Sequence, residues 1–296
     1  MRASSPRIVL FLMFFATSFS ACKQFNTEEK EMPSETKAKK VFSNTDMYDL
    51  TNPKVLKLPG ELDEISGLAY YPKDTSVFAI IDEDAILFKI PLKDPRHLQT
   101  WIFGDKEDYE DLVLKENTFY VLVSKGDVKK LRFESGKLLV DEIQFPDGKK
   151  SKNEFESLIV DSISQKLQLI CKNCLLDKKS RVTVYSVSDS TNAYDTAHVI
   201  KLNSLEEKLG ADKFALRVSG SAVHPLTKDI YMVSSIEKLL VVYDSTYNLK
   251  SANFLDPEIY KQPEGITFTP EGDMIISNES AGKGPANLLL FKNKLK

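Results

Sequence analysis

The sequence predicts an all-β fold, and within that class a single β-propeller of six four-stranded blades, with five or seven blades as alternatives. One pattern, a short strand, a turn, a strongly apolar strand, a second turn and an alternating strand, recurs five times. Its spacing of roughly 44 residues suits a four-stranded blade. An acidic residue recurs near the start of the pattern in four of the five copies. A two-layer sandwich would also be all-β, but it would not explain a carboxylate that recurs in phase.

The five copies and the two chain ends together account for the predicted domain. Between the third and fourth copies the spacing widens, and residues 203–214 predict a short helical insertion with Gly210 as its C-terminal cap. The apolar segment 55–58 and the C-terminal strand would supply a sixth blade by joining the two chain ends, which removes open sheet edges. We therefore expect one propeller domain over residues 44–296. The copies occupy residues 64–90, 108–131, 154–185, 218–243 and 262–291.

Residues 1–21 have the features of a lipoprotein signal peptide. Arg2 and Arg7 precede an apolar run that is too short to span a bilayer. A Ser-Ala-Cys sequence ending at Cys22 follows and resembles a lipobox, whose cysteine becomes the lipid-modified N-terminus after cleavage. Phe19 stands where leucine is most usual. The alternative is an ordinary cleaved signal in which Cys22 is incidental.

Residues 22–43 are polar, highly charged and nearly free of aromatic side chains, which is typical of a flexible linker. We therefore expect an exported protein of the bacterial cell envelope that is anchored to a membrane through a lipid on Cys22. The formal net charge of the chain is -3, with 40 basic and 43 acidic residues, and no dense basic cluster occurs in its body. These values give no electrostatic signature of nucleic-acid binding, so we expect no nucleic-acid partner.

Carboxylates at the strand starts define the candidate site. In a propeller the first strand of each blade lies nearest the central channel, so side chains at equivalent strand starts form a ring. Four such starts carry Glu64, Glu110, Glu156 and Glu264, and Ser219 occupies the corresponding place in the fourth copy. The ends of the second strands would add further channel-lining side chains, namely Asp82, Glu83, Lys125, Lys172, Asn278 and Glu279.

Carboxylates that face one channel repel one another unless a cation neutralises them or their pKa values rise. Ca²⁺ takes six to eight oxygen ligands of the kinds that this ring offers. We therefore predict Glu264, Asn278, Glu156 and Glu64 as candidate Ca²⁺ ligands. The alternative is structural: the acids accept backbone hydrogen bonds or pair with Lys125 and Lys172, and so fasten the blades together. The candidate ligand-binding residues of the channel are Glu110, Asp82, Glu83, Glu279, Lys125 and Lys172.

Six segments between residues 58 and 291 resemble, in order, the motifs of the SdiA-regulated family of exported bacterial proteins. They are EISGLAYYP, IIDEDAILFKI, FGDKEDYEDLVL, NEFESLIVD, HPLTKDIYMVSS and QPEGITFTPEGDMIISNE. The resemblance implies a six-bladed propeller, often a lipoprotein, with a kinship to calcium-dependent lactonase-like and phytase-related propellers. In those propellers a metal-binding Glu precedes a Gly at a blade start, and Glu264 matches this pattern best. The resemblance implies little about a reaction.

Other chemistry has weaker support in the sequence. Cys171 and Cys174 form a C-x-x-C motif, but there is no second pair and no βαβ context, so zinc and thioredoxin-like interpretations are weak. A local disulfide and a reduced pair both remain open. The chain has 3 histidines, and no G-x-S-x-G elbow supports a Ser-His-Asp arrangement.

Two classes of function follow. The first is an envelope lipoprotein whose propeller binds a small ligand or an envelope protein, with Ca²⁺ as an optional component. The alternative is a calcium-dependent hydrolase of the lactonase, esterase or phytase kind, in which a channel carboxylate activates water. Binding ranks first because the sequence contains acids without a recognisable base or nucleophile.

Overall fold

The structure is a computed structural model that describes residues 42–146, 148, 152–177, 180–211, 214–280, 282 and 284–295. The predicted signal peptide, Cys22 and nearly all of the predicted linker lie outside these residues. Within the described part of the chain, no helix has the length and apolar character needed to cross a membrane.

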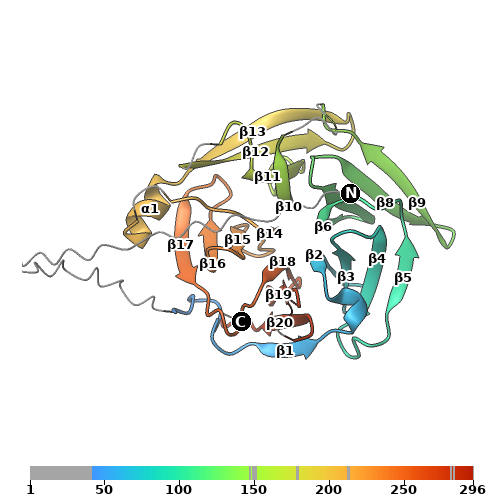
Figure 1. Ribbon diagram of the computed structural model, residues 1–296, viewed down its shortest axis with the longest axis horizontal. Helices are drawn as coiled ribbons and strands as arrows, with labels where there is room; N and C mark the ends of the chain where they lie inside the picture. Colours follow the sequence, from blue (N-terminus) through green and yellow to red (C-terminus); the bar gives the residue numbers. More distant parts are fainter. Residues whose placement is uncertain are drawn as a thin grey trace, which may run out of the picture. The chain divides into compact units, whose positions relative to one another are not determined.

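The described residues form five antiparallel four-stranded sheets around a central axis (Figure 1). The first strands of the five blades contact one another in a closed ring about that axis. Blade one contains β2 (Ile65–Tyr71), β3 (Ser76–Ile81), β4 (Ile86–Pro91) and β5 (Gln99–Ile102). Blade two contains β6 (Tyr109–Lys115), β7 (Thr118–Val123), β8 (Val128–Glu134) and β9 (Lys137–Ile143). Blade three contains β10 (Glu154–Val160), β11 (Leu167–Asn173), β12 (Arg181–Ser188) and β13 (Ala193–Lys201).

Blade four contains β14 (Gly220–Val223), β15 (Ile230–Ser234), β16 (Leu239–Tyr243) and β17 (Leu249–Phe254). Blade five contains β18 (Pro263–Phe268), β19 (Met274–Asn278), β20 (Asn287–Phe291) and, from the other end of the chain, β1 (Lys54–Lys57). The second strand of each blade is buried along nearly its whole length, which explains why these strands appear in the sequence as continuous apolar runs.

The prediction of six blades is wrong, and the propeller has five. The N-terminal strand β1 pairs with β20, with Lys54 opposite Leu290 and Lys57 opposite Asn287. It therefore supplies the fourth strand of blade five and does not begin a blade of its own. The predicted joining of the two chain ends is present: β1, from the N-terminal side of blade one, completes the sheet of the last blade.

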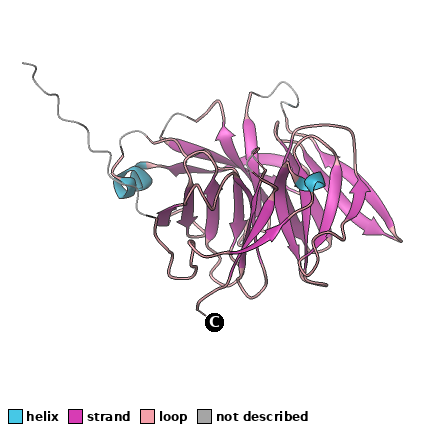
Figure 2. Cartoon of the chain, turned by 60° about the horizontal axis from the view of Figure 1, so that its bottom comes forward, coloured by secondary structure: helices cyan, strands magenta, loops and turns pink. Residues whose placement is uncertain are grey.

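The predicted helical insertion is present in the connection between β13 and β14. Helix α1 spans Asn203–Leu209, buries Leu205, and ends at Gly210, whose φ of 62° lies in the left-handed region. Glycine adopts this conformation at no steric cost, as a helix C-cap requires. Figure 1 labels α1 at the periphery of the propeller, and Figure 2 shows in a second view that helix is rare among the strands.

Candidate functional site

The strands that begin at the channel start with a β-bulge. In blade one Ile65 pairs with Ile81, the register then shifts, and Leu68 pairs with Ala79. Blades two, three and five have the same irregularity, whereas β14 pairs with β15 without one. A bulge turns its extra residue out of the regular alternation, so it can direct a side chain into the channel. In these four blades the first residue of the bulge directly follows the last residue pair before the bulge. These residues are Ser66, Glu110, Glu156 and Glu264.

This register differs from the predicted alignment at one position. In blade one the position of Glu110 is occupied by Ser66. Glu64 lies two residues earlier, so it is equivalent to Asp108 of blade two and Glu154 of blade three. The propeller therefore has two successive levels of acids at this end of the channel. The sequence interpretation missed Asp108 and Glu154, although both precede a buried aromatic residue as Glu64 precedes Ile65.

Glycines below the bulges allow the first strands to approach closely. A Cβ atom on Gly220 would lie 2.0 Å from the carbonyl oxygen of Glu264, and one on Gly67 would lie 2.4 Å from the amide nitrogen of Leu112. A Cβ on Gly265 would meet the carbonyl oxygen of Ser66 at 2.6 Å. In each case the obstacle is backbone of the neighbouring blade. These glycines therefore form a neck in the channel that no larger residue could occupy unchanged.

Asp111 occupies the neck position in blade two, where blades one and five have glycine. Its carboxyl group accepts hydrogen bonds from the amide groups of Leu112 and Leu158 at 2.8 and 2.7 Å, and from the hydroxyl of Ser157 at 3.3 Å. Burial raises the pKa of Asp111 to about 8. The side chain joins blades two and three across the neck. The sequence interpretation did not single out Asp111. It directly follows Glu110, and side chains alternate along extended backbone, so only one of the two was expected at the channel.

One cavity of about 320 Å³ opens above the neck, and we call it the acidic cavity. It holds eight of the ten predicted channel residues. Eight carboxylates but only two lysines line it. Its charged residues are Glu64, Asp82, Asp108, Glu110, Glu154, Glu156, Glu264, Glu279, Lys125 and Lys172.

The two other predicted residues point elsewhere. Asn278 is fully buried, and its Nδ2 donates to the carbonyl oxygen of Ile259 at 2.9 Å and to Oδ1 of Asn287 at 3.1 Å. Glu83 lines a neighbouring hollow of about 290 Å³ together with Lys106 and Glu107. Asn278 therefore fastens the strand ends of blade five, and Glu83 lies beside the acidic cavity and not in it.

Burial and mutual repulsion raise the pKa of four acids in the acidic cavity, and Glu279, whose neighbour is Glu64, is one of them. Burial, reinforced by the charges of Asp108 and Asp82, raises the pKa of Glu110 to about 9, although a hydrogen bond with Ser124 opposes the rise. Burial and the nearby charge of Glu279 raise the pKa of Glu264 to about 7. Burial and a hydrogen bond with Asp108 raise the pKa of Asp82 to about 6. The cavity therefore contains more carboxylates than its cations can neutralise.

The structural alternative holds for part of the ring. Lys172 forms an ion pair with Glu156, and Lys125 lies 3.9 Å from Glu154. The side-chain amide of Gln262 donates a hydrogen bond to Glu279. Among the described residues, the other six carboxylates of the acidic cavity have no salt bridge to a lysine or arginine. Ion pairs thus account for two of the acids, whereas others, such as Glu279 and Glu110, have hydrogen bonds to neutral side chains that leave their charge unbalanced.

The donor geometry does not place a ready-made set of metal ligands in the acidic cavity. Within the described part of the chain, three His, Cys, Asp or Glu ligand atoms lie within 4.8 Å of one another only at Cys171, Cys174 and Asp177. The two cysteines of that group form a disulfide. A Ca²⁺ ion among the channel acids would therefore also need water, hydroxyl or carbonyl ligands, or a movement of the flexible glutamates.

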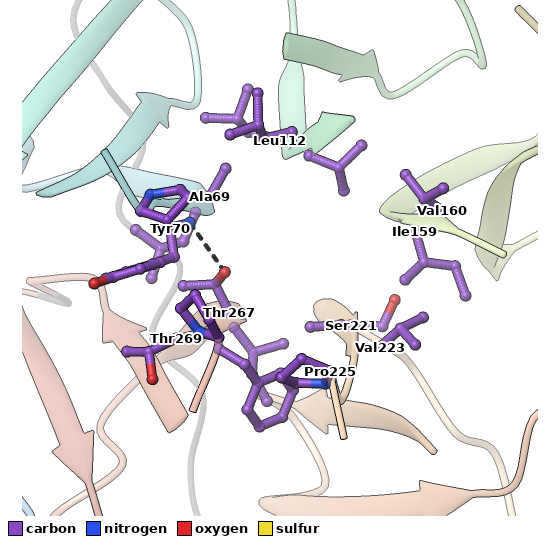
Figure 3. A pocket seen from close by; sticks show the side chains of 18 of the residues that line it. Ala69, Tyr70, Leu112, Ile159, Val160, Ser221, Val223, Pro225, Thr267 and Thr269 are labelled. Atoms are coloured by element: carbon purple, nitrogen blue, oxygen red, sulfur yellow. Dashed lines mark hydrogen bonds between the residues drawn. The ribbon is translucent and has the colours of Figure 1, made fainter. Parts of the chain in front are cut away.

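The opposite end of the channel has a different character. The strand ends surround a cavity of about 430 Å³ lined mainly by aliphatic side chains, including Leu112, Ile159 and Val223 (Figure 3). The amide group of Tyr70 donates to Oγ1 of Thr267 at 3.1 Å across the boundary between two blades. Charged chemistry is therefore concentrated at the end where the first strands begin.

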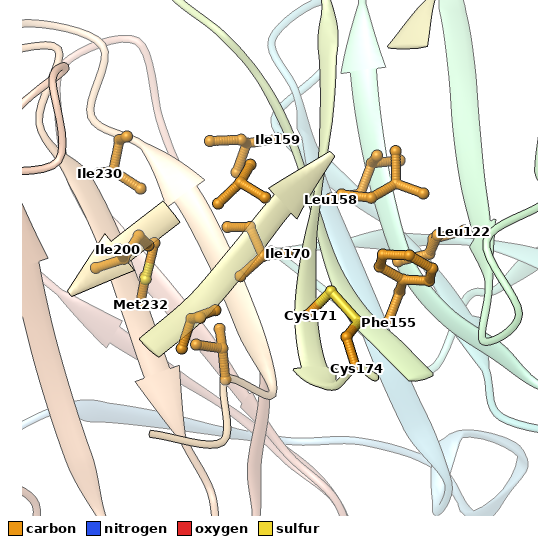
Figure 4. Close-up of a cluster of buried hydrophobic side chains, with 14 of the residues drawn as sticks. Leu122, Phe155, Leu158, Ile159, Ile170, Cys171, Cys174, Ile200, Ile230 and Met232 are labelled. Atoms are coloured by element: carbon orange, nitrogen blue, oxygen red, sulfur yellow. A yellow bond between two sulfur atoms is a disulfide. The ribbon is translucent and has the colours of Figure 1, made fainter. Parts of the chain in front are cut away.

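The disulfide between Cys171 and Cys174 settles the state that the sequence left open (Figure 4). It encloses Lys172, the partner of Glu156, and packs among buried side chains that include Phe155.

We expect Cys171→Ala/Cys174→Ala to lower the free energy of unfolding by about 2 kcal/mol, because the closed loop is short. Thermal unfolding with and without dithiothreitol measures this. The reductant should lower the melting temperature of the wild type only, and an equal decrease in the variant would contradict the prediction.

The fold and the charged channel mouth define a five-bladed β-propeller with a polar pocket on its axis. Residues 46–281 match the SdiA-regulated family, and the chain belongs to that family. None of the curated proteins compared with the sequence matches it.

Solved structures share the fold at low sequence identity. A glutaminyl cyclase from Myxococcus xanthus has a TM-score of 0.57 and 10% identity, with coverage of 81% of this chain and 95% of its own. A gluconolactonase from Xanthomonas campestris has a TM-score of 0.52 and 10% identity, with coverage of 86% and 98%. A glucose dehydrogenase has a TM-score of 0.52 and 9% identity, with coverage of 80% and 99%. These proteins carry out different reactions, so the likeness supports the fold alone.

Proposed function

We propose that this protein is an exported, membrane-anchored lipoprotein of the cell envelope whose propeller binds a cationic ligand in the acidic cavity. The observation that carries the proposal is the excess of eight carboxylates over two lysines in one cavity. Such an arrangement is unfavourable in the absence of a partner, because buried like charges repel. A bound cation would lower the pKa of Glu110 and Glu264 and remove this repulsion.

Ca²⁺ is the inorganic cation that best fits the chemistry of these donors. It prefers carboxylate, carbonyl and water oxygens and tolerates irregular coordination. Of the predicted ligands, Glu64, Glu156 and Glu264 line the cavity, whereas Asn278 does not. An organic ammonium group would use the same carboxylates through charge-assisted hydrogen bonds.

A calcium-dependent hydrolase is the second candidate, and the pKa of Glu264 near 7 favours it, because a general base works best with a pKa close to the working pH. Binding ranks first because no histidine or cysteine is among the described residues that line the acidic cavity. Hydrolysis of lactone and phosphoester substrates, measured with and without Ca²⁺, would decide between the two.

The proposal predicts that Ca²⁺ or the organic dication cadaverine stabilises the purified protein. A ligand at a 100-fold excess over its Kd adds about 2.7 kcal/mol to the free energy of unfolding. For a domain of this size that corresponds to a rise in melting temperature of about 5–10 °C. Thermal unfolding is the measurement.

The Glu110→Gln/Glu264→Gln variant should lose most of this rise. The matched control is Glu116→Gln, which alters a glutamate at the apolar end of the channel and should keep the full rise. If neither cation stabilises the wild type, the acidic cavity is not a cation site and the proposal fails.

A further inference from the structure

A second charged cavity adjoins the acidic cavity and has the opposite character. It measures about 400 Å³, and we call it the basic cavity. Lys172, Arg217, Lys238 and Lys261 line it, against the carboxylates of Glu156 and Glu264 only. The three cations other than Lys172 come from blade four or from the connections that flank it.

The two cavities share part of their walls. Glu156, Lys172, Gln262 and Glu264 line both of them. The boundary is therefore formed by one ion pair, Glu156 with Lys172, together with a glutamate whose pKa is close to neutral. A ligand that crosses this boundary would have a wall of acids on one side and a cluster of cations on the other.

Two cations of the basic cavity, Arg217 and Lys261, lie near acids that do not line it. Nε of Arg217 donates to Oε1 of Glu237 at 2.8 Å, and Glu237 does not line the cavity. Nζ of Lys238 donates to the carbonyl oxygen of Lys261 at 2.6 Å. Nζ of Lys261 lies 3.9 Å from Glu258, whose side chain is 88% exposed. A guanidinium group has five N–H donors and an ammonium group has three, so Arg217 and Lys261 have more donors than these contacts use.

From these observations we propose that the channel mouth binds a small zwitterion with its amine in the acidic cavity and its carboxylate in the basic cavity. The inference rests on the proposed function for the amine and goes beyond it for the carboxylate. Lys261 and Arg217 would donate charge-assisted hydrogen bonds to the carboxylate. The acids without a salt bridge, Glu110 and Glu264 among them, would accept hydrogen bonds from the amine.

The test is isothermal titration of the whole protein with three kinds of probe. The zwitterions are the ω-amino acids from glycine to 6-aminohexanoate, which sample the unknown separation between the two groups. Cadaverine is the five-carbon diamine and glutarate is the five-carbon dicarboxylate, so both match 5-aminopentanoate in length. Without a basic cavity, the dication should bind best because acids predominate. We expect instead that the best ω-amino acid binds at least about tenfold more tightly than either matched probe, as one hydrogen bond to a charged group allows.

Two variants test whether the carboxylate of the bound zwitterion lies in the basic cavity. Lys261→Met should weaken binding of the best ω-amino acid by about tenfold or more and leave cadaverine binding unchanged or tighter. The matched control is Lys57→Met, on the exposed strand β1 of blade five, which should bind like the wild type. If Lys261→Met weakens cadaverine and the zwitterion equally, the carboxylate does not lie in the basic cavity and the inference is overturned.

The two proposals fail in different ways. If Ca²⁺ or cadaverine binds but no ω-amino acid binds more tightly than cadaverine, the cation site stands and the zwitterion inference is wrong. If glutarate binds as tightly as the best zwitterion, the acidic cavity does not hold the amine and the zwitterion inference is wrong, whatever the result for Ca²⁺ and cadaverine. If neither Ca²⁺ nor any of the three kinds of probe binds, both proposals are wrong.

Discussion

Gly220→Ala is expected to lower the free energy of unfolding by about 3–4 kcal/mol, a large effect for one methyl group. The added Cβ would lie 2.0 Å from the carbonyl oxygen of Glu264. That oxygen belongs to the backbone at the bulge of the neighbouring blade, so it cannot rotate away as a side chain could. Blades four and five would have to separate at the neck, and the acids above the neck would be displaced. Urea unfolding followed by tryptophan fluorescence measures the change.

Gly60→Ala is the matched control for this prediction. Gly60 lies in the short 3-10 helix Gly60–Leu62, is exposed, and its Cβ would have only Oδ2 of Asp63 nearby, at 3.9 Å. We expect a change within about 0.5 kcal/mol, as for most surface substitutions. If Gly220→Ala is as mild as Gly60→Ala, the close approach of the two blades at the neck is not a packing constraint.

The five copies of the repeat correspond to the five blades, and the error of a sixth blade came from the strands at the chain ends. Each copy contained three recognisable strands, because the inner strands of a blade are buried and carry a clear apolar signal. The outer strands β5 and β9 are mostly exposed along their length, so their sequences show little of this signal. The four-residue strand β1 is equally exposed. Local sequence does not determine which sheet an isolated strand joins. The segment that forms β1 was therefore assigned to a sixth blade, whereas it is the fourth strand of blade five.

The candidate site shows a similar division. Recurring acids predicted the channel lining at Glu110, Glu156 and Glu264, since position within a repeat determines position around the axis. At the end of the second strand of blade five, both Asn278 and Glu279 were predicted to line the channel. Only one of two consecutive residues can face it, because side chains alternate along extended backbone. The structure selects Glu279 over Asn278. Arg217 and Lys261 of the basic cavity lie in the connections before and after blade four, outside the copies of the repeat, so only the folded chain brings them to the channel mouth.

Glu110→Gln is expected to raise the free energy of unfolding by about 2 kcal/mol at pH 8 and to leave it nearly unchanged at pH 4. The folded pKa of Glu110 is about 9 and its ordinary value is 4.5. Between these values the folded protein retains a proton that the unfolded chain has lost. Stability is therefore greatest below the unfolded pKa and decreases as the pH rises towards the folded one. Glutamine resembles the protonated acid in shape and cannot ionise, so the variant should lack this decrease.

The expected gain is smaller than the roughly 6 kcal/mol that the full pKa shift would represent, because pH 8 lies below the folded pKa and because solvent at the open mouth of the cavity can stabilise the ionised form. Urea unfolding at unit steps between pH 4 and pH 9 tests the prediction, with Glu116→Gln as the control that should follow the wild type. If the free energies of unfolding of Glu110→Gln and the wild type change in parallel with pH, the folded protein does not raise the pKa of Glu110 and the prediction is wrong. A saturating cation should abolish the difference at pH 8, because it stabilises the ionised carboxylate of the wild type and gives the glutamine variant no such benefit.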